Sequence, residues 1–183
     1  LELSYANTAI KNENRLREVI AASEKDRSDI AVSFSPEKKV LPYEFIDVVH
    51  NRLVTLNVES RLATNPTVTL SRPIPPAYYI LPSASEAAEK LQQMGVEVEQ
   101  LQTETIATVE AFTVTALQED GEEVNSIYPV RVTTQMVEKT MTFPAGSYRV
   151  DTGQKYVHVA TVMLEPESAN GFVNYRIIDV KQN

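Results

Sequence analysis

The 183 residues are enough for one domain with a substantial core or for two small domains. The net charge of −8 disfavours nucleic-acid binding because an acidic surface repels phosphates, and the absence of cysteine excludes disulfides, thiolate catalysis and cysteine-ligated zinc. No apolar run approaches the ~20 residues that a membrane span needs, and the longest candidates, such as residues 156–164, are short and interrupted.

The first third of the chain predicts a helix followed by strands. Residues 5–30 contain no proline or glycine, and their apolar side chains roughly repeat with the helical period, so we expect a helix there. Residues 31–34 and 40–58 are rich in β-branched and aromatic side chains, which predicts strands with Pro36 and Pro42 as breaks.

A polar stretch then marks the expected internal boundary. It ends in Asn65-Pro66, a turn signal, so we expect a domain boundary or a long connection here. Residues 1–66 are then an N-terminal helix and β segment, either linker-like or the end of a preceding domain. Residues 67–183 are expected to form a β-rich accessory domain.

Residues 77–101 predict a strand-helix-strand unit, preceded by an extended proline-dense stretch over residues 72–76. Ser83 and Glu86 have the spacing of a capping box, in which each side chain satisfies a free backbone N–H group at a helix start. Gly95 follows the helix where a left-handed residue is favoured.

The rest of the chain is predicted to be mostly β-structure. Asp120-Gly121 is a hairpin signal, residues 143–146 predict a turn, and residues 155–164 predict a helix that ends at Pro166. Further strands are expected over residues 106–117, 124–134, 136–143, 147–150 and 172–180. The predicted fold class is therefore α+β, with mainly antiparallel sheets and an N-terminal helix.

The two histidines are the first candidates for a metal site. A zinc site needs three or four protein ligands, so without cysteine it must recruit carboxylates. Asp47 lies three residues before His50, and in a strand these two side chains point to opposite faces. His158 lies in the expected helix without a carboxylate at helical spacing. We interpret both histidines as ordinary core or surface residues.

The acidic clusters have similarly plain interpretations. The cluster near the expected hairpin does not match the spacing of an EF-hand loop, so we expect a solvated tip made by Glu119, Asp120, Glu122 and Glu123. Glu97 and Glu99 alternate with valines, which predicts the wet face of a half-buried strand rather than an acid/base pair.

Other catalytic signatures are missing from the sequence. No G-x-S-x-G motif or glycine-rich phosphate loop occurs, and the five glycines all lie at expected turns or helix ends. A binding face could instead be built from tyrosines, although strand aromatics more often pack in cores: Tyr78, Tyr79, Tyr128, Tyr148, Tyr156 and Tyr175. We therefore assign no catalytic, cofactor-binding or metal-binding residue to this chain.

Two ordered blocks of sequence carry a family resemblance. The first block comprises Arg72-Pro73, residues 77–82, a helix to Leu91, residues 95–98, Leu101 and residues 109–112; the second comprises residues 143–148, Gln154 and residues 164–168. Together they resemble the region that follows the catalytic domain in bacterial zinc carboxypeptidases of the carboxypeptidase A-like family. Residues 5–30 resemble the helix that closes that catalytic domain.

The resemblance implies a secreted or cell-surface hydrolase that removes C-terminal residues from peptides with a zinc ion. That family holds zinc with His-x-x-Glu and a later His, and neither His50 nor His158 begins such a motif. Because the chain starts at Leu1 without a signal segment, we expect it to begin inside a longer gene product or after processing. Its zinc and its catalytic residues would then precede Leu1.

Three functional hypotheses remain open from the sequence. The chain is a non-catalytic C-terminal accessory domain whose partner is the catalytic domain of its parent, with peptide substrate reached only indirectly. Alternatively, the chain has no enzymatic parent and is a β-rich module that binds cell-wall glycan, another polysaccharide or a protein. A third hypothesis is a regulatory segment that blocks an active site.

Overall fold

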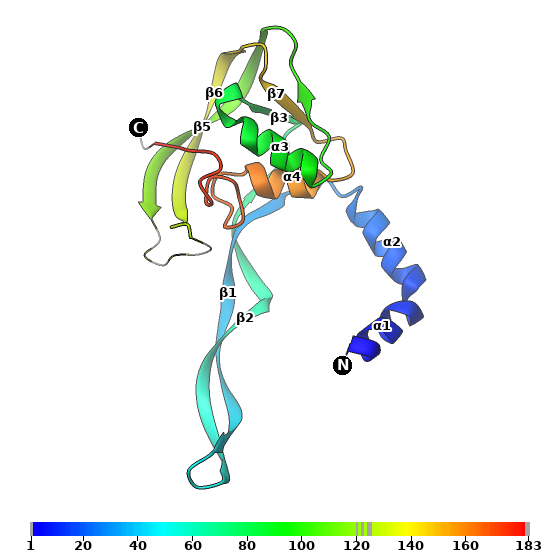
Figure 1. Cartoon of the computed structure of the whole chain (residues 1–183), viewed down its shortest axis with the longest axis vertical. Helices are drawn as coiled ribbons and strands as arrows, with labels where there is room; N and C mark the ends of the chain where they lie inside the picture. Colours follow the sequence, from blue (N-terminus) through cyan, green and yellow to red (C-terminus); the bar gives the residue numbers. More distant parts are fainter. Residues whose placement is uncertain (1, 120, 122, 124–125, 182–183) are drawn as a thin grey trace. The chain divides into compact units, whose positions relative to one another are not determined.

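The computed structural model describes residues 2–119, 121, 123 and 126–181. The chain has an α+β fold with mainly antiparallel strands and helix at its N-terminus, as predicted (Figure 1). Its elements in order are α1 (Glu2–Lys11), α2 (Glu13–Ser23), β1 (Ile30–Asp47), β2 (Arg52–Arg72), β3 (Ala77–Ile80), the short 3-10 helix η1 (Pro82–Ala84), α3 (Ser85–Gln93), β4 (Glu99–Gln100), β5 (Thr105–Glu119), β6 (Val130–Phe143), β7 (Tyr148–Asp151) and α4 (Val157–Leu164).

Contacts between residues divide the chain into two compact units. One unit comprises Leu1–Ile30 together with Pro73–Asn183, and the other is Ala31–Arg72. This division differs from the boundary expected at residue 66. The turn expected at Asn65-Pro66 is wrong, because both residues lie inside the continuous strand β2. We call the first unit the main unit and the second the β1–β2 ribbon.

The main unit is organised around a three-stranded antiparallel sheet in the order β3-β7-β4. Ala77 pairs with Asp151 and Ile80 with Tyr148, whereas Glu99 pairs with Arg149 on the other edge of β7. The predicted strand-helix-strand unit is confirmed, with β3, α3 and β4 at the expected positions. A strand from much later in the chain, β7, lies between its two strands.

The ends of α3 show how local sequence sets its bounds. The expected capping box is wrong, because Ser83 lies in η1 and the helix starts after Ala84 without a side-chain cap. The C-terminal end follows the prediction, since Gly95 has a φ of +86° and donates its N–H to Gln92 O at 3.0 Å. The Val96 N–H donates to Leu91 O at 3.0 Å, which completes a Schellman motif.

Replacing Gly95 tests this helix end. Alanine is strained at a positive φ, and its Cβ would lie 3.2 Å from the ring of Tyr156, so we expect Gly95→Ala to lower the free energy of unfolding by about 1–2 kcal/mol. Urea unfolding followed by circular dichroism measures the loss. Gly121→Ala is the control, because no atom lies within 4 Å of its added Cβ, and an equal loss there would contradict the explanation.

The core of the main unit lies between its sheet and its helices. Buried side chains of β3, α3, β7 and α4 form one cluster, which Phe172 joins from the C-terminal segment. The helix predicted at residues 155–164 is confirmed as α4. The strand predicted over residues 172–180 is wrong, because that segment is folded into turns, with the Ile177 N–H donating to Phe172 O at 2.8 Å.

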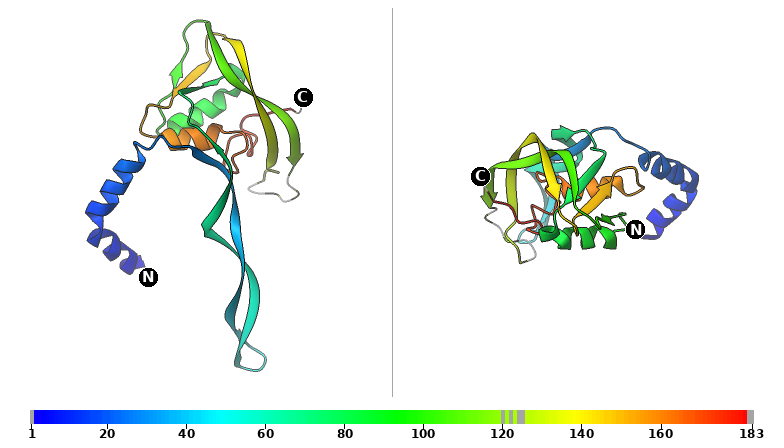
Figure 2. Two further views of the ribbon diagram at one scale, coloured as in Figure 1. Left: turned by 180° about the vertical axis from the view of Figure 1, so that it is seen from behind. Right: turned by 90° about the horizontal axis from the view of Figure 1, so that it is seen from above.

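Strands β5 and β6 form a second antiparallel pair in the main unit. Their register runs from Thr105 opposite Phe143 to Glu119 opposite Val130, with an irregularity after Val114. Figure 2 shows the pair as a twisted hairpin. The strands expected at 124–134 and 136–143 correspond to the single strand β6, which begins at Val130. Asp120 of the expected hairpin turn lies outside the described residues.

The N-terminal region is helical as predicted, but the helix is divided and shorter. It breaks at Asn12, whose side-chain amide donates to Thr8 O at 2.8 Å, and α2 ends at Ser23. The competing side-chain hydrogen bond explains the break, since asparagine favours such local contacts over helix continuation.

The β1–β2 ribbon consists of two long paired strands joined by a turn over residues 48–51 (Figure 1). Pro36 and Pro42 do not break β1 as expected. Each strand of this two-stranded sheet has an open edge, and a proline is tolerated where its missing N–H would face away from the partner strand. The same reason explains how Pro66 remains inside β2.

Candidate docking surface

The turn of the β1–β2 ribbon brings together the two residues that a simple strand would keep apart. The Nδ1 atom of His50 lies 2.8 Å from Asp47 Oδ2, so the expectation of opposite faces is wrong. A tight turn follows Asp47, and Asn51 adopts a φ of +45° within it. The hydrogen bond from His50 is the main cause that lowers the pKa of the Asp47 carboxyl. Both residues belong to the surface of the turn.

The second histidine joins α4 to the end of α2. His158 Nε2 lies 3.0 Å from Ser23 O, and Lys155 Nζ lies 3.3 Å from Glu24 Oε1. The Arg27 guanidinium donates to Gln154 O at 3.3 Å. These polar contacts hold the N-terminal helices to the rest of the main unit.

The described residues offer no site for the zinc ion that the family resemblance places in the parent enzyme. Among residues 2–119, 121, 123 and 126–181, no group of three or more histidine, aspartate or glutamate side chains could hold a metal. Glu119 is instead an ion-pair partner of Arg176. Asp120 and Glu122 lie outside the described residues. We therefore derive no zinc chemistry from this chain.

The segment that leads into β4, residues 96–99, has the predicted wet face, although only Glu99 of it lies in the strand. Glu97 and Glu99 are exposed, whereas Val96 is buried and Val98 is half-buried. Glu99 Oε2 lies 4.0 Å from Arg149 Nη1, a loose and exposed contact.

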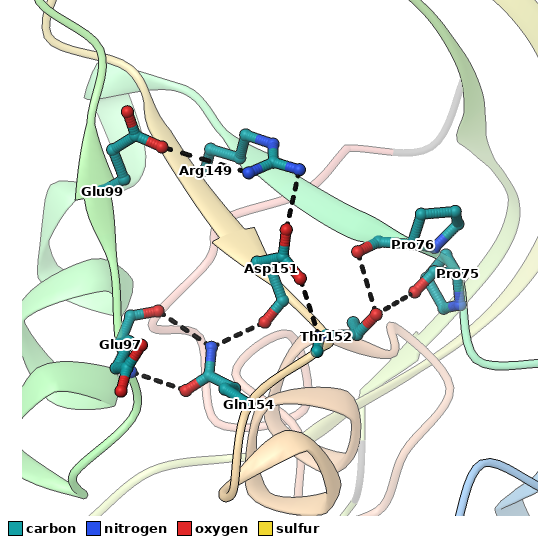
Figure 3. Close-up of polar contacts among 9 residues, drawn as sticks. Pro75, Pro76, Glu97, Glu99, Arg149, Asp151, Thr152 and Gln154 are labelled. Carbon is teal, nitrogen blue, oxygen red and sulfur yellow. Dashed lines mark hydrogen bonds and ion pairs between the residues drawn. The ribbon is translucent and has the colours of Figure 1, made fainter.

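A polar network beside this segment ties three parts of the main unit together (Figure 3). The buried Gln154 side chain accepts a hydrogen bond from Glu97 N at 2.7 Å and donates to Glu97 O at 3.0 Å and Asp151 O at 2.6 Å. The Thr152 hydroxyl contacts Pro75 O at 2.6 Å and Pro76 O at 2.9 Å. The Gln154 and Thr152 side chains mostly contact backbone atoms, so the network positions these segments and does not form a reaction site.

An exposed carboxylate completes this network. The backbone N–H of Gly153 donates to Asp151 Oδ1 at 2.7 Å and is the main cause that lowers the Asp151 pKa, and Arg149 contributes further. A lowered pKa in the folded state means that ionised Asp151 supports folding above its unfolded pKa. That support is lost as the pH falls through its folded pKa.

Removing the Gln154 amide tests how much the network stabilises the fold. Gln154→Leu leaves the Glu97 N–H and two carbonyl groups without their partner, so we expect the free energy of unfolding to fall by about 2–4 kcal/mol. Urea unfolding compares this variant with Gln92→Leu, which changes an exposed position on α3 and should have little effect. Equal losses would contradict the assigned role.

The tyrosines of the predicted binding face have several separate environments. Tyr78 donates a hydrogen bond to the buried Glu165 carboxylate at 2.7 Å, and Tyr79 stacks on Phe143 with ring centroids 4.5 Å apart. Tyr148 packs against the core, and Tyr156 lies beside Gly95. Core packing therefore explains Tyr78, Tyr79 and Tyr148, whereas Tyr128 and Tyr156 are 48% and 41% exposed.

The N-terminal helices present a groove lined partly by apolar side chains. It has a volume of about 400 Å³ and lies across the break between α1 and α2. Within α2, no residue is buried. The groove is lined by Tyr5, Thr8, Ala9, Asn12, Arg15, Leu16 and Val19. An exposed apolar face of this kind is typical of a surface that packs on another domain or protein.

The turn of the ribbon presents a second apolar surface, which we call the ribbon tip and define as residues 46–53. Its large apolar side chains are between 67% and 85% exposed: Ile46, Val48, Val49 and Leu53. The sequence motifs pointed to His50 and Asp47 here, and these apolar neighbours were not predicted as a surface. The signal was present as five apolar residues within nine positions: Phe45, Ile46, Val48, Val49 and, after the turn, Leu53.

Comparison with known proteins finds relatives that are named carboxypeptidases. Carboxypeptidase 2 of Trichophyton tonsurans and that of Trichophyton equinum are each 29% identical to this chain over 181 residues, which are 97% of the chain and 34% of the relative. This chain is similar to one region of fungal carboxypeptidases. Probable carboxypeptidase 2 of Trichophyton verrucosum is 29% identical over 166 residues, 88% of the chain and 32% of the relative.

The chain spans about a third of the length of the curated relatives it matches. No protein-family model matches the sequence, and no solved structure matches it. In the described part of the chain, no helix has both the length and the apolar character to cross a membrane. The relatives bear out a carboxypeptidase-related region, and they are fungal where the sequence resemblance was to bacterial enzymes.

Proposed function

We propose that this chain is a non-catalytic accessory region of a zinc carboxypeptidase of the carboxypeptidase A-like family, following the catalytic domain. The observation that carries the proposal is the match of nearly the whole chain to about a third of carboxypeptidase 2. Its role is to stabilise the catalytic region, and its setting is extracellular or on the cell surface. The zinc ligands and the catalytic residues belong to another region of the parent enzyme, outside these 183 residues.

Two features of the chain support an accessory role. The main unit has its own sheet, helices and buried core, so it is equipped to act as a scaffold. The groove on α1 and α2 and the ribbon tip both expose apolar side chains. Covering such surfaces with another region of the same enzyme removes apolar area from water and stabilises the assembly.

The proposal is tested with the longer polypeptide encoded by the gene of this chain. Its melting temperature and its kcat/KM on a peptide with a free C-terminal carboxylate are compared with those of a version that lacks residues 1–183. We expect cleavage by the intact enzyme, and a lower melting temperature with reduced kcat/KM after the deletion. Unchanged values would contradict the stabilising role, and a rise in kcat/KM would favour an inhibitory segment instead.

A further inference from the structure

The β1–β2 ribbon is unusually long for a structure with so little internal packing. Its strands have 18 and 21 residues, whereas strands in globular proteins usually have about 3–10. Within the described residues, β1 and β2 pair only with each other, so neither has a strand partner on its other edge. Two-stranded ribbons are marginally stable in water unless another surface covers them, and open edges invite pairing.

The ribbon tip concentrates apolar surface at one end of this structure. Val48 and Val49 occupy the turn, and Ile46 and Leu53 flank it on the two strands. Turns usually carry polar or small residues, because they face water. Two adjacent valines more than four-fifths exposed are therefore poorly placed unless another surface covers them.

A single side chain, that of Asp47, accepts two backbone hydrogen bonds within the ribbon tip. Asp47 Oδ1 accepts hydrogen bonds from Val49 N at 3.1 Å and His50 N at 3.2 Å, and its other oxygen contacts the His50 ring at 2.8 Å. Arg52 Nε lies 3.5 Å from the same oxygen. A turn fixed in advance loses little conformational entropy on binding, which favours its use as a docking element.

Charge and connectivity indicate what covers the ribbon tip. Residues 31–72 contain five basic and four acidic residues, a net charge of +1, in a chain whose net charge is −8. The net charge of the whole chain decides the interaction at long range, and two copies that each carry −8 repel each other. A region of the same polypeptide is present at a high effective concentration, so its contact with the ribbon tip does not require two molecules to associate.

We propose that the ribbon tip docks onto the catalytic region of the same polypeptide and thereby holds the accessory region in place. This inference rests on the proposed function, which supplies the partner. The tip contributes the apolar contact through Val48, Val49, Ile46 and Leu53, and Asp47 positions the turn that presents them. The contact is intramolecular, so its strength does not depend on protein concentration.

Hydrogen exchange measured by mass spectrometry tests the docking. The longer polypeptide and the 183-residue chain are labelled in parallel, and we expect residues 46–53 to exchange about tenfold more slowly in the longer polypeptide. Val48→Asp together with Val49→Asp should restore fast exchange at the tip of the longer polypeptide. Thr67→Asp with Thr69→Asp adds the same charge at exposed positions of β2 away from the turn and should leave the tip protected.

The same samples separate this inference from the proposed function. Suppose that the longer polypeptide cleaves the peptide and that its melting temperature and kcat/KM fall when residues 1–183 are deleted. If its ribbon tip nevertheless exchanges as fast as that of the 183-residue chain, docking by the ribbon tip is overturned and the proposed function stands. Tip protection that appears in the 183-residue chain as its concentration rises would identify a second copy as the occupant and overturn the intramolecular contact. Loss of the proposed function shows separately, as a longer polypeptide without carboxypeptidase activity.

Discussion

Phe172→Ala should destabilise the 183-residue chain by about 3–5 kcal/mol, the loss typical of a buried phenylalanine in a core. Phe172 is 2% exposed and joins the C-terminal turns to the core cluster of the main unit. Its N–H donates to Met163 O at 2.8 Å, so the backbone beside the ring is anchored on α4. Because the surrounding helices and sheet cannot all close onto the vacated space, a cavity adds to the lost transfer free energy.

Urea unfolding followed by circular dichroism gives the change in the free energy of unfolding. Phe172→Leu should retain most of the stability because it keeps much of the apolar volume. Phe45→Ala is the matched control, since that ring is 45% exposed and its loss should change the stability of the isolated chain by less than about 0.5 kcal/mol. Similar values for Phe172→Ala and Phe45→Ala would contradict the assigned core.

Leu91→Ala should cost about 2–5 kcal/mol for a reason that is almost purely one of packing. Leu91 is fully buried on α3, and alanine favours helix at least as well as leucine. The Leu91 carbonyl can still accept the hydrogen bond from Val96 N–H that ends the helix. The loss therefore reports the contacts that the side chain makes with the sheet and α4.

Leu16→Ala provides the comparison on another helix of the same unit. Leu16 is 45% exposed on the groove of α1 and α2, so we expect its truncation to change the midpoint of urea unfolding very little. A large loss at Leu16 in the isolated chain would show that the groove is already filled from within. That result would contradict its interpretation as an open surface.

The sequence predicts best where local chemistry and core packing agree. Residues 77–101 combine an alternating strand, an apolar helical face and Gly95 at the helix end, and the structure has all three. The prediction of a last strand over residues 172–180 was wrong. The apolar pattern around Phe172 also suits a series of turns whose side chains pack into a core from one side. Nothing local in Phe172 or Val173 distinguishes the two outcomes.

The ribbon shows a different limit. Pro36, Pro42 and Asn65-Pro66 are reliable breaks in central strands, and they lose that meaning when a strand has an open edge. Which strands have open edges depends on pairing across the whole chain, which a local pattern does not contain. The predicted turn at residue 66 therefore failed for a reason of topology.

The ribbon tip was also not predicted from the sequence, because the candidate residues there were those that can bind a metal. Searches for metal ligands select His50 and Asp47, whereas the structure makes Asp47 the residue that shapes the turn and leaves Val48 and Val49 exposed beside it. Exposure of an apolar residue cannot be read from its identity, because the same valines would suit a buried strand. Only the ribbon geometry shows that they face outward.

The most direct test of the accessory assignment is to measure zinc content and release of C-terminal residues for the 183-residue chain and the longer polypeptide side by side. We predict that the longer polypeptide binds zinc and cleaves the peptide, and that a zinc chelator abolishes its activity, whereas the 183-residue chain does neither. Stoichiometric zinc binding together with peptide cleavage by the 183-residue chain alone would contradict a non-catalytic role.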